Sequence, residues 1–167
     1  NAFCLEPSLC SLTRSEISCP GLPDTLDGLR VGVMADFHFK PGTDDALVDE
    51  AIGILRREKP DMVVLPGDFI DSDPAVLDPL LEYLKRLDPE HGVFASMGNH
   101  DGWSGSAGTV RRGFDRAGIP LLVNRNSVIR IRGERLAIAA TDHVWLGKPD
   151  PVRTLRGIPS EIGRASC

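Results

Sequence analysis

The sequence predicts an α/β fold built on a parallel sheet. Three short apolar runs, each of a length and character typical of a buried strand, follow one another along the chain at 29–35, 62–66 and 93–97. A helical pattern lies between successive runs, so the runs are roughly 30 residues apart, about the length of one strand–helix–strand unit. Strands joined by such crossovers lie parallel in one sheet.

The first two helices expected between these strands each have an apolar stripe. One is expected over 44–58, with acidic residues at its positive end and Pro60 after its last turn. The other has two competing start signals, Asp73 and Asp78, each a capping residue followed by proline. Its buried stripe consists of Leu80, Leu81, Leu84 and Leu87.

A third helix is expected over 109–117, inside which apolar residues recur at helical spacing and after which Gly118 serves as a stop. The pattern then changes to alternation, which predicts a β-hairpin formed by 127–132 and 135–141. Glycine followed by glutamate between these segments suits a type II′ turn.

The expected register of this hairpin places its apolar residues on one face. With a turn at residues 133–134, Ile131 lies opposite Leu136 and Ile129 lies opposite Ile138. Near the start of the chain, 11–18 can form an opening strand that a turn-rich connector joins to the first apolar run.

A short polar motif directly follows each of the three apolar runs. If the strands are parallel, all three motifs emerge at the carboxyl edge of one sheet, where open α/β sheets bind ligands. Carboxylate, imidazole and amide oxygen at one edge make a cation site, and this mixed ligand set suits Mn, Fe or Zn better than Ca or Mg. The motifs are Asp36-Phe37-His38, Gly67-Asp68-Phe69-Ile70-Asp71 and Gly98-Asn99-His100-Asp101.

In motif, order and spacing the chain resembles the calcineurin-like metallophosphoesterases, which share the succession D-x-H, G-D-x-x-D and G-N-H-[DE]. The segments 20–30 and 141–150 resemble one branch of that family, which contains small bacterial phosphoesterases and hydrolases of UDP-2,3-diacylglucosamine-type diphosphates. The resemblance implies the N-terminal portion of a four-layer α/β/β/α sandwich. A single, C-terminally incomplete domain is then expected over 1–167. It would comprise an N-terminal strand and connector (1–27), a βαβαβα core (28–120), and a hairpin with a truncated tail (121–167).

The resemblance also implies a pair of divalent metal ions. By this resemblance Asp36 and His38 bind the first ion, Asp68 bridges both, and Asn99 binds the second. A shared carboxylate offsets the repulsion between two cations held roughly 3.5–4 Å apart. His143 follows a strand end as well, but the family pattern does not place a ligand there.

Catalysis in such a site needs a proton donor for the leaving group. The resemblance assigns this role to His100, whose ring Asp71 would orient. Asp101 is expected to hold its loop by hydrogen bonds rather than to bind metal. Gly67 and Gly98 would support the motif loops, although both could also be ordinary turn glycines.

Complete family members supply three further histidines, one at a later strand end and two in a G-H-x-H loop. This sequence has four histidines, and none follows His143. The expectation is therefore that the isolated chain binds at most one divalent ion weakly and leaves the apolar hairpin face around Ile131 poorly covered. The alternative to a phosphoesterase is a non-catalytic fragment or a degenerate binding module. The coding sequence beyond Cys167 would distinguish the two.

The charge of the chain limits its partners. A net charge of −5 argues against a general nucleic-acid binder. Seven arginines within 111–135 form either a solvated face or a basic rim for an anionic substrate or lipid headgroup. The expected partner is a phosphorylated small molecule or a lipid-linked substrate, with peripheral membrane contact. No apolar run reaches the roughly 20 residues of a membrane span, but family relatives with a similar opening often carry an anchor or signal before it. The sequence leaves the compartment unknown, with a bacterial-type cytoplasm and a membrane surface as the two expectations.

Overall fold

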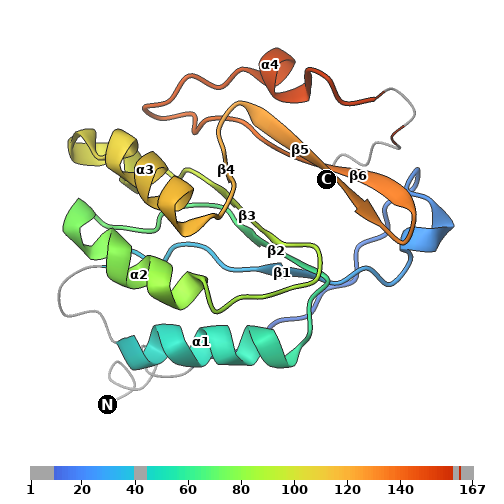
Figure 1. Ribbon diagram of the computed structural model, residues 1–167, viewed down its shortest axis with the longest axis horizontal. Helices are drawn as coiled ribbons and strands as arrows, with labels where there is room; N and C mark the ends of the chain where they lie inside the picture. Colours follow the sequence, from blue (N-terminus) through green and yellow to red (C-terminus); the bar gives the residue numbers. More distant parts are fainter. Residues whose placement is uncertain (1–9, 40–44, 160–161, 163–167) are drawn as a thin grey trace.

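A computed structural model describes residues 10–39, 45–159 and 162 (Figure 1). Strands and helices alternate through the first two thirds of the chain, and a hairpin follows. The elements are η3 Asp24–Leu26, β1 Val31–Val33, α1 Asp45–Arg57, β2 Met62–Leu65, η4 Pro74–Val76, α2 Leu77–Leu84, β3 Val93–Ser96, η5 His100–Gly105, α3 Ala107–Ala117, β4 Leu121–Leu122, β5 Arg125–Ile131, β6 Glu134–Ala140 and α4 Pro151–Leu155.

The first sheet has four parallel strands in the order β1-β2-β3-β4. Val33 pairs with Val64, which in turn pairs with Phe94, so the three apolar runs are neighbours. The predicted α/β fold with a parallel sheet is confirmed. Strand β4 was not expected, because two residues are too few to give a periodic signal.

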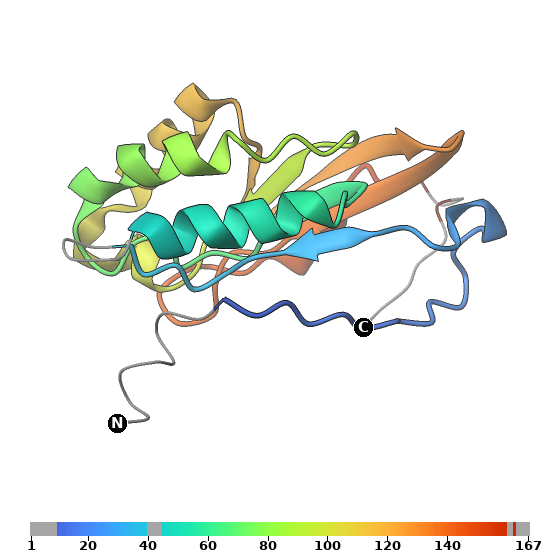
Figure 2. The same ribbon diagram turned by 90° about the horizontal axis from the view of Figure 1, so that it is seen from below.

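Helices α1, α2 and α3 cover one face of this sheet (Figures 1 and 2). The predicted stripes are their buried sides, and Ile52, Leu80 and Phe114 are fully buried there. Asp73 supplies the start signal, because its carboxylate accepts a hydrogen bond from Ala75 N (2.9 Å) in the 3-10 turn that leads into α2. Gly118, with φ 71°, ends α3 as predicted.

Strands β5 and β6 form a second, antiparallel sheet that packs on the other face of the first sheet. Ile131 is fully buried against Met62, Phe94 and Leu122. The expectation of a poorly covered hairpin face is therefore wrong for Ile131. Its neighbours on that face are half-buried, since the parallel sheet already covers them; these are Ile129, Leu136 and Ile138.

The register of the hairpin differs from the predicted one by two residues. Ile131 pairs with Glu134 and Ile129 pairs with Leu136, so the turn residues are Arg132 and Gly133. Both have positive φ (51° and 88°), which defines a type I′ rather than a type II′ turn. A slip of two residues keeps every side chain on its expected face, whereas a slip of one would reverse the faces.

The predicted strand over 11–18 is wrong, because these residues form neither helix nor strand. The segment runs past α1 instead (dark blue in Figure 2). Arg14 donates two hydrogen bonds to the Glu58 carboxylate (2.9 and 2.7 Å), which direct the segment to the helix rather than to a strand edge. Within the described ranges, no helix is both long and apolar enough to cross a bilayer.

Candidate metal centre

The loop after β1 is aligned with the loop after β2 by backbone hydrogen bonds. Asp36 N donates to Gly67 O (3.1 Å) and His38 N donates to Asp68 O (3.0 Å). The pairing of the two strands thus continues beyond their ends, as far as a bridge at Phe39. This continuation brings the first motif beside the second at the carboxyl edge of the sheet.

Asp36, His38 and Asp68 converge on one point. His38 Nε2 lies 3.8 Å from Asp36 Oδ1 and 4.0 Å from Asp68 Oδ2, and one ligand atom from each residue lies within 4.8 Å of the others. Two atoms that share an ion through bonds of about 2.0–2.2 Å can be at most about 4.4 Å apart. The separations from the histidine therefore fit a shared cation.

All three of these residues have a left-handed backbone. Their φ angles are 56° for Asp36, 44° for His38 and 55° for Asp68. This conformation is uncommon outside glycine and costs of order 1–3 kcal/mol per residue, less for aspartate. Strain of this kind is concentrated at functional sites, so it supports the same three positions independently of their side chains.

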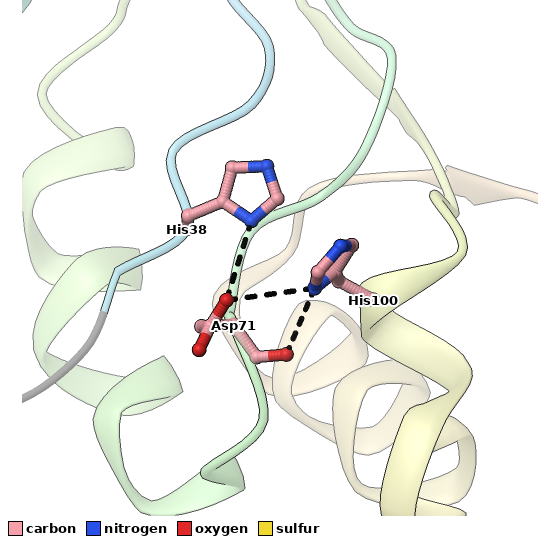
Figure 3. Close-up of side chains that lie close together, drawn as sticks. All are labelled: His38, Asp71 and His100. Atoms are coloured by element: carbon pink, nitrogen blue, oxygen red, sulfur yellow. Dashed lines mark hydrogen bonds and ion pairs between the residues drawn. The ribbon is translucent and has the colours of Figure 1, made fainter.

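His38, Asp71 and His100 form a second group (Figure 3). The Asp71 carboxylate lies between the two rings, with Oδ1 3.7 Å from His38 Nδ1 and 3.6 Å from His100 Nδ1. The rings meet edge to face with their centroids 4.4 Å apart. The expected proximity of Asp71 and His100 is therefore present.

The closer contact between these two residues involves the backbone. His100 Nδ1 lies 3.1 Å from the carbonyl oxygen of Asp71. An N–H at Nδ1 donates to that oxygen, and this hydrogen bond fixes the ring and leaves Nε2 on the opposite side available. Asp71 thus orients His100 through its main chain as well as through its side chain.

Asp101 holds the second and third motifs together. Its side chain is fully buried and accepts hydrogen bonds from four backbone N–H groups: those of Asp68 (2.9 Å), Phe69 (2.8 Å), Ile70 (3.3 Å) and Gly98 (2.9 Å). Burial raises the pKa of the Asp101 carboxyl above its usual range, while the four donors oppose that rise. These contacts fit the predicted structural role of Asp101.

Gly67 and Gly98 allow the same two loops to touch. A Cβ atom on Gly67, whose φ is 114°, would lie 2.1 Å from Gly98 N, and one on Gly98 would lie 2.1 Å from Asp68 Oδ1. No side chain fits in either place without moving the backbone. The two residues are therefore more than ordinary turn glycines.

Asn99 is placed beside Asp68 by its neighbour. His100 N donates to Asp68 Oδ1 (2.9 Å), so the backbone that follows Asn99 touches the carboxylate expected to bridge two ions. The Asn99 side chain is half-buried. Its role as a ligand stays a prediction, as do the roles assigned to the other site residues.

Two further residues contact the motif loops. The centroids of the Trp103 and His100 rings lie 3.9 Å apart. The only sequence signal for this contact is that the two residues are three positions apart, which brings side chains together in a helical turn. His143 Nε2 would lie 3.1 Å from a Cβ on Gly102. His143 therefore lies at the edge of the third motif, but it belongs to neither ligand group found among the described residues.

The arginines after Arg111 do not all turn toward this site. Arg116 pairs with Asp78 of α2 (2.7 Å). Arg132 donates to the carbonyl oxygens of Thr25 and Asp27. These two arginines fasten surface elements to one another, as the interpretation of a solvated face implies.

The fold and the site define an α/β protein with candidate cation ligands at the carboxyl edge of its parallel sheet. The model of the calcineurin-like phosphoesterase family matches residues 29–148. This range includes the parallel sheet, all three motifs and the hairpin. The chain belongs to the calcineurin-like phosphoesterase family.

Individual relatives agree with this placement. The chain is 36% identical over 98 residues to the UDP-2,3-diacylglucosamine pyrophosphatase LpxG of Chlamydia muridarum. The aligned residues cover 58% of this chain and 30% of that protein. It is 27% identical over 151 residues to the phosphodiesterase YaeI of Escherichia coli, covering 87% and 55%. A Danio rerio transmembrane protein with metallophosphoesterase domain is 33% identical over 86 residues, covering 52% and 20%. The chain thus spans between a fifth and just over half of the length of these relatives.

Proposed function

We propose that this chain carries metal-binding and proton-donating groups of an enzyme that hydrolyses a phosphate ester or a diphosphate bond. Metal-dependent phosphoester hydrolysis is the activity that its family implies. The observation that carries the proposal is the convergence of Asp36, His38 and Asp68 on one point, next to His100. Each of these side chains comes from a loop at the carboxyl edge of the sheet.

The donor set fits divalent cations such as Mn, Fe or Zn. Asp36, His38 and Asp68 would hold one ion, and Asp68 with Asn99 would contribute to a second. When bound, such ions supply positive charge to the phosphoryl oxygens and make water acidic enough to attack near neutral pH. Within the pair of carboxylates, Asp68 is the better placed to be shared, because its side chain is 15% exposed whereas that of Asp36 is 74% exposed.

His100 would donate the proton that the leaving oxygen needs. Its Nδ1 is occupied by the carbonyl of Asp71, and the carboxylate of Asp71 lies 3.6 Å away, so the ring is held from one side. Nε2 is then the atom that can give a proton to a leaving alkoxide. Trp103 packs on the same ring and limits its rotation.

The substrate class proposed is a phosphorylated small molecule, with lipid-linked diphosphates included. The support for the lipid-linked class is the relative named UDP-2,3-diacylglucosamine pyrophosphatase. The relative named phosphodiesterase supports the broader class. The chemistry of the site serves both, since each substrate presents phosphoryl oxygens that divalent cations can hold and a leaving oxygen next to the attacked phosphorus.

The test is a His100→Asn variant of the protein that carries this chain. We expect kcat for alkyl phosphodiesters to fall by at least about 100-fold, the lower end of what a lost general acid costs, with unchanged metal content. For a nitrophenyl leaving group, which needs little protonation, the loss should be much smaller. His143→Asn is the matched control, because this histidine lies outside both ligand groups. An equal loss across leaving groups would remove His100 from this role.

A further inference from the structure

Three consecutive large apolar residues are exposed in the loop between β6 and α4. Val144 is 75% exposed, Trp145 82% and Leu146 62%. Single exposed apolar residues are ordinary, but a contiguous group that includes a tryptophan marks a contact surface. We call Val144, Trp145 and Leu146 the apolar tip.

Hydrogen bonds clamp both ends of the loop that bears the tip. Asn124 Oδ1 accepts from Asp142 N (2.9 Å) and from Asp150 N (2.8 Å), while its Nδ2 donates to Lys148 O (2.8 Å). The Asp142 carboxylate accepts from His143 N and from Lys148 N, both at 3.0 Å. Five hydrogen bonds therefore hold the two ends of this loop in place.

The tip lies at the edge of the candidate metal centre. His143, directly before the tip, packs against Gly102 of η5, which follows Asp101 in the chain. The next residue, Trp103, is 42% exposed and contacts His100. Figure 1 shows the loop between β6 and α4 on the side of the molecule where α3 begins. Whatever binds the tip is thus brought next to the third motif.

Basic residues accompany the tip. Residues 141–156 contain three bases, Lys148, Arg153 and Arg156, and two acids, Asp142 and Asp150, a local charge of +1 on a chain whose net charge is −5. All three bases are exposed. In α4, Val152 and Leu155 are also exposed, at 76% and 52%. Apolar side chains interleaved with bases are the pattern that binds an anionic membrane surface.

We propose that the apolar tip and α4 form a docking surface for an anionic lipid bilayer. Trp145 and Leu146 enter the boundary between headgroups and acyl chains, and the bases contact lipid phosphates. Docking in this way brings the candidate metal centre close to the headgroup layer, where phosphoesters of lipids lie. The docking is a binding property, and it does not depend on the hydrolytic function proposed above.

The first experiment measures sedimentation of the protein with vesicles. The vesicles are equimolar phosphatidylglycerol and phosphatidylcholine, and phosphatidylcholine alone serves for comparison. We expect Trp145→Ser with Leu146→Ser to weaken binding to the anionic vesicles about tenfold or more, because most of the apolar area of the tip is removed. Ile17→Ser is the matched control, since Ile17 is 70% exposed on the N-terminal segment and should not matter.

The charge contribution is tested separately. Lys148→Gln with Arg153→Gln should reduce binding to anionic vesicles to the level seen with phosphatidylcholine, whereas Arg111→Gln, an exposed arginine at the start of α3, should not. Loss of binding with Arg111→Gln to the same extent would mean that general charge, rather than this surface, attracts the vesicles, and would overturn the proposal.

The second experiment observes insertion with the tip intact. The sequence has two tryptophans, so Trp145 is the single emitter in a Trp103→Phe variant. Its fluorescence should shift to shorter wavelength and be quenched by anionic vesicles that contain brominated acyl chains. Absence of quenching, or a Trp145→Ser variant that sediments like the unsubstituted protein, would overturn the proposal. A substitution in the tip whose only effect is to convert a dimer into a monomer would also overturn the proposal.

Hydrolysis of bis(4-nitrophenyl) phosphate in vesicle-free buffer separates this proposal from the proposed function. Tip variants should keep that rate unchanged, because the substrate is soluble and the tip contributes no group to either ligand cluster. An inactive protein that still inserts Trp145 into vesicles would contradict the proposed function alone. An active protein that does not bind vesicles would contradict the docking surface alone.

Discussion

Asp101 and Asp36 stand at opposite extremes within one set of motifs. The Asp101 carboxylate is fully buried and accepts four backbone hydrogen bonds. The Asp36 side chain is 74% exposed, and its ion-pair contact is His38 at 3.8 Å. The Asp101 carboxylate holds the motif loops together, whereas the exposed Asp36 carboxylate is available to bind a ligand. Stability and ligand binding are therefore assigned to different carboxylates of the same edge.

We call Asp101, Gly67 and Gly98 the building residues. They also offset the conformational cost of the left-handed backbone at the site. Three candidate ligands have a left-handed backbone, which is unfavourable by itself. The hydrogen bonds to Asp101 and the contact between Gly67 and Gly98 hold the second motif in that conformation. If this division is right, substitutions at the building residues change stability, and substitutions at Asp36 change cation affinity.

The largest effect should come from removing the buried carboxylate. Asp101→Ala leaves four N–H groups without their acceptor, so the free energy of unfolding should fall by about 3–5 kcal/mol. Asp36→Asn should change it by less than about 0.5 kcal/mol, as for other exposed positions. Urea unfolding of the metal-free protein measures both. Equal effects of the two substitutions would contradict the comparison.

A smaller loss is expected for Gly98→Ala. The added methyl group would meet the Asp68 carboxylate and backbone, and separating the two loops should cost about 2–4 kcal/mol. Gly53→Ala in α1 is the matched control, because its nearest contact is Arg57 Nη1 at 3.5 Å. Helix propensity predicts that this control raises stability by about 0.5–1 kcal/mol. A Gly98→Ala variant as stable as the unsubstituted protein would show that the loops do not need their close contact.

The sequence predicts which residues come together at the site, but not the backbone conformation that these residues adopt. Parallel strands of one sheet end at one edge, so the apolar runs and their spacing suffice to bring Asp36, Asp68 and His100 together. The left-handed angles of Asp36, His38 and Asp68 could not be foreseen, because they depend on hydrogen bonds between loops from different strands.

Elsewhere the errors come from weak local signals. A glycine preceded by arginine and followed by glutamate suits two hairpin turns equally, so the register was predicted with the turn one position too late. Strand β4 and helix α4 have two and five residues, which is too short for a periodic pattern. The contact of Trp103 with His100 depends on the 3-10 turn η5, whose six residues are too few for a periodic pattern.

Binding of Mn²⁺ to the purified chain, followed by the electron paramagnetic resonance of free Mn²⁺, tests the central claim most directly. We expect saturable binding of about one ion, and an affinity at least about tenfold lower in Asp36→Asn, because one of three converging ligands loses its charge. Asp73→Asn, which alters a capping carboxylate far from the motifs in sequence, should bind like the unsubstituted chain. No saturable binding, or equal affinity for Asp36→Asn and the unsubstituted chain, would contradict the assignment of Asp36, His38 and Asp68 as a metal site.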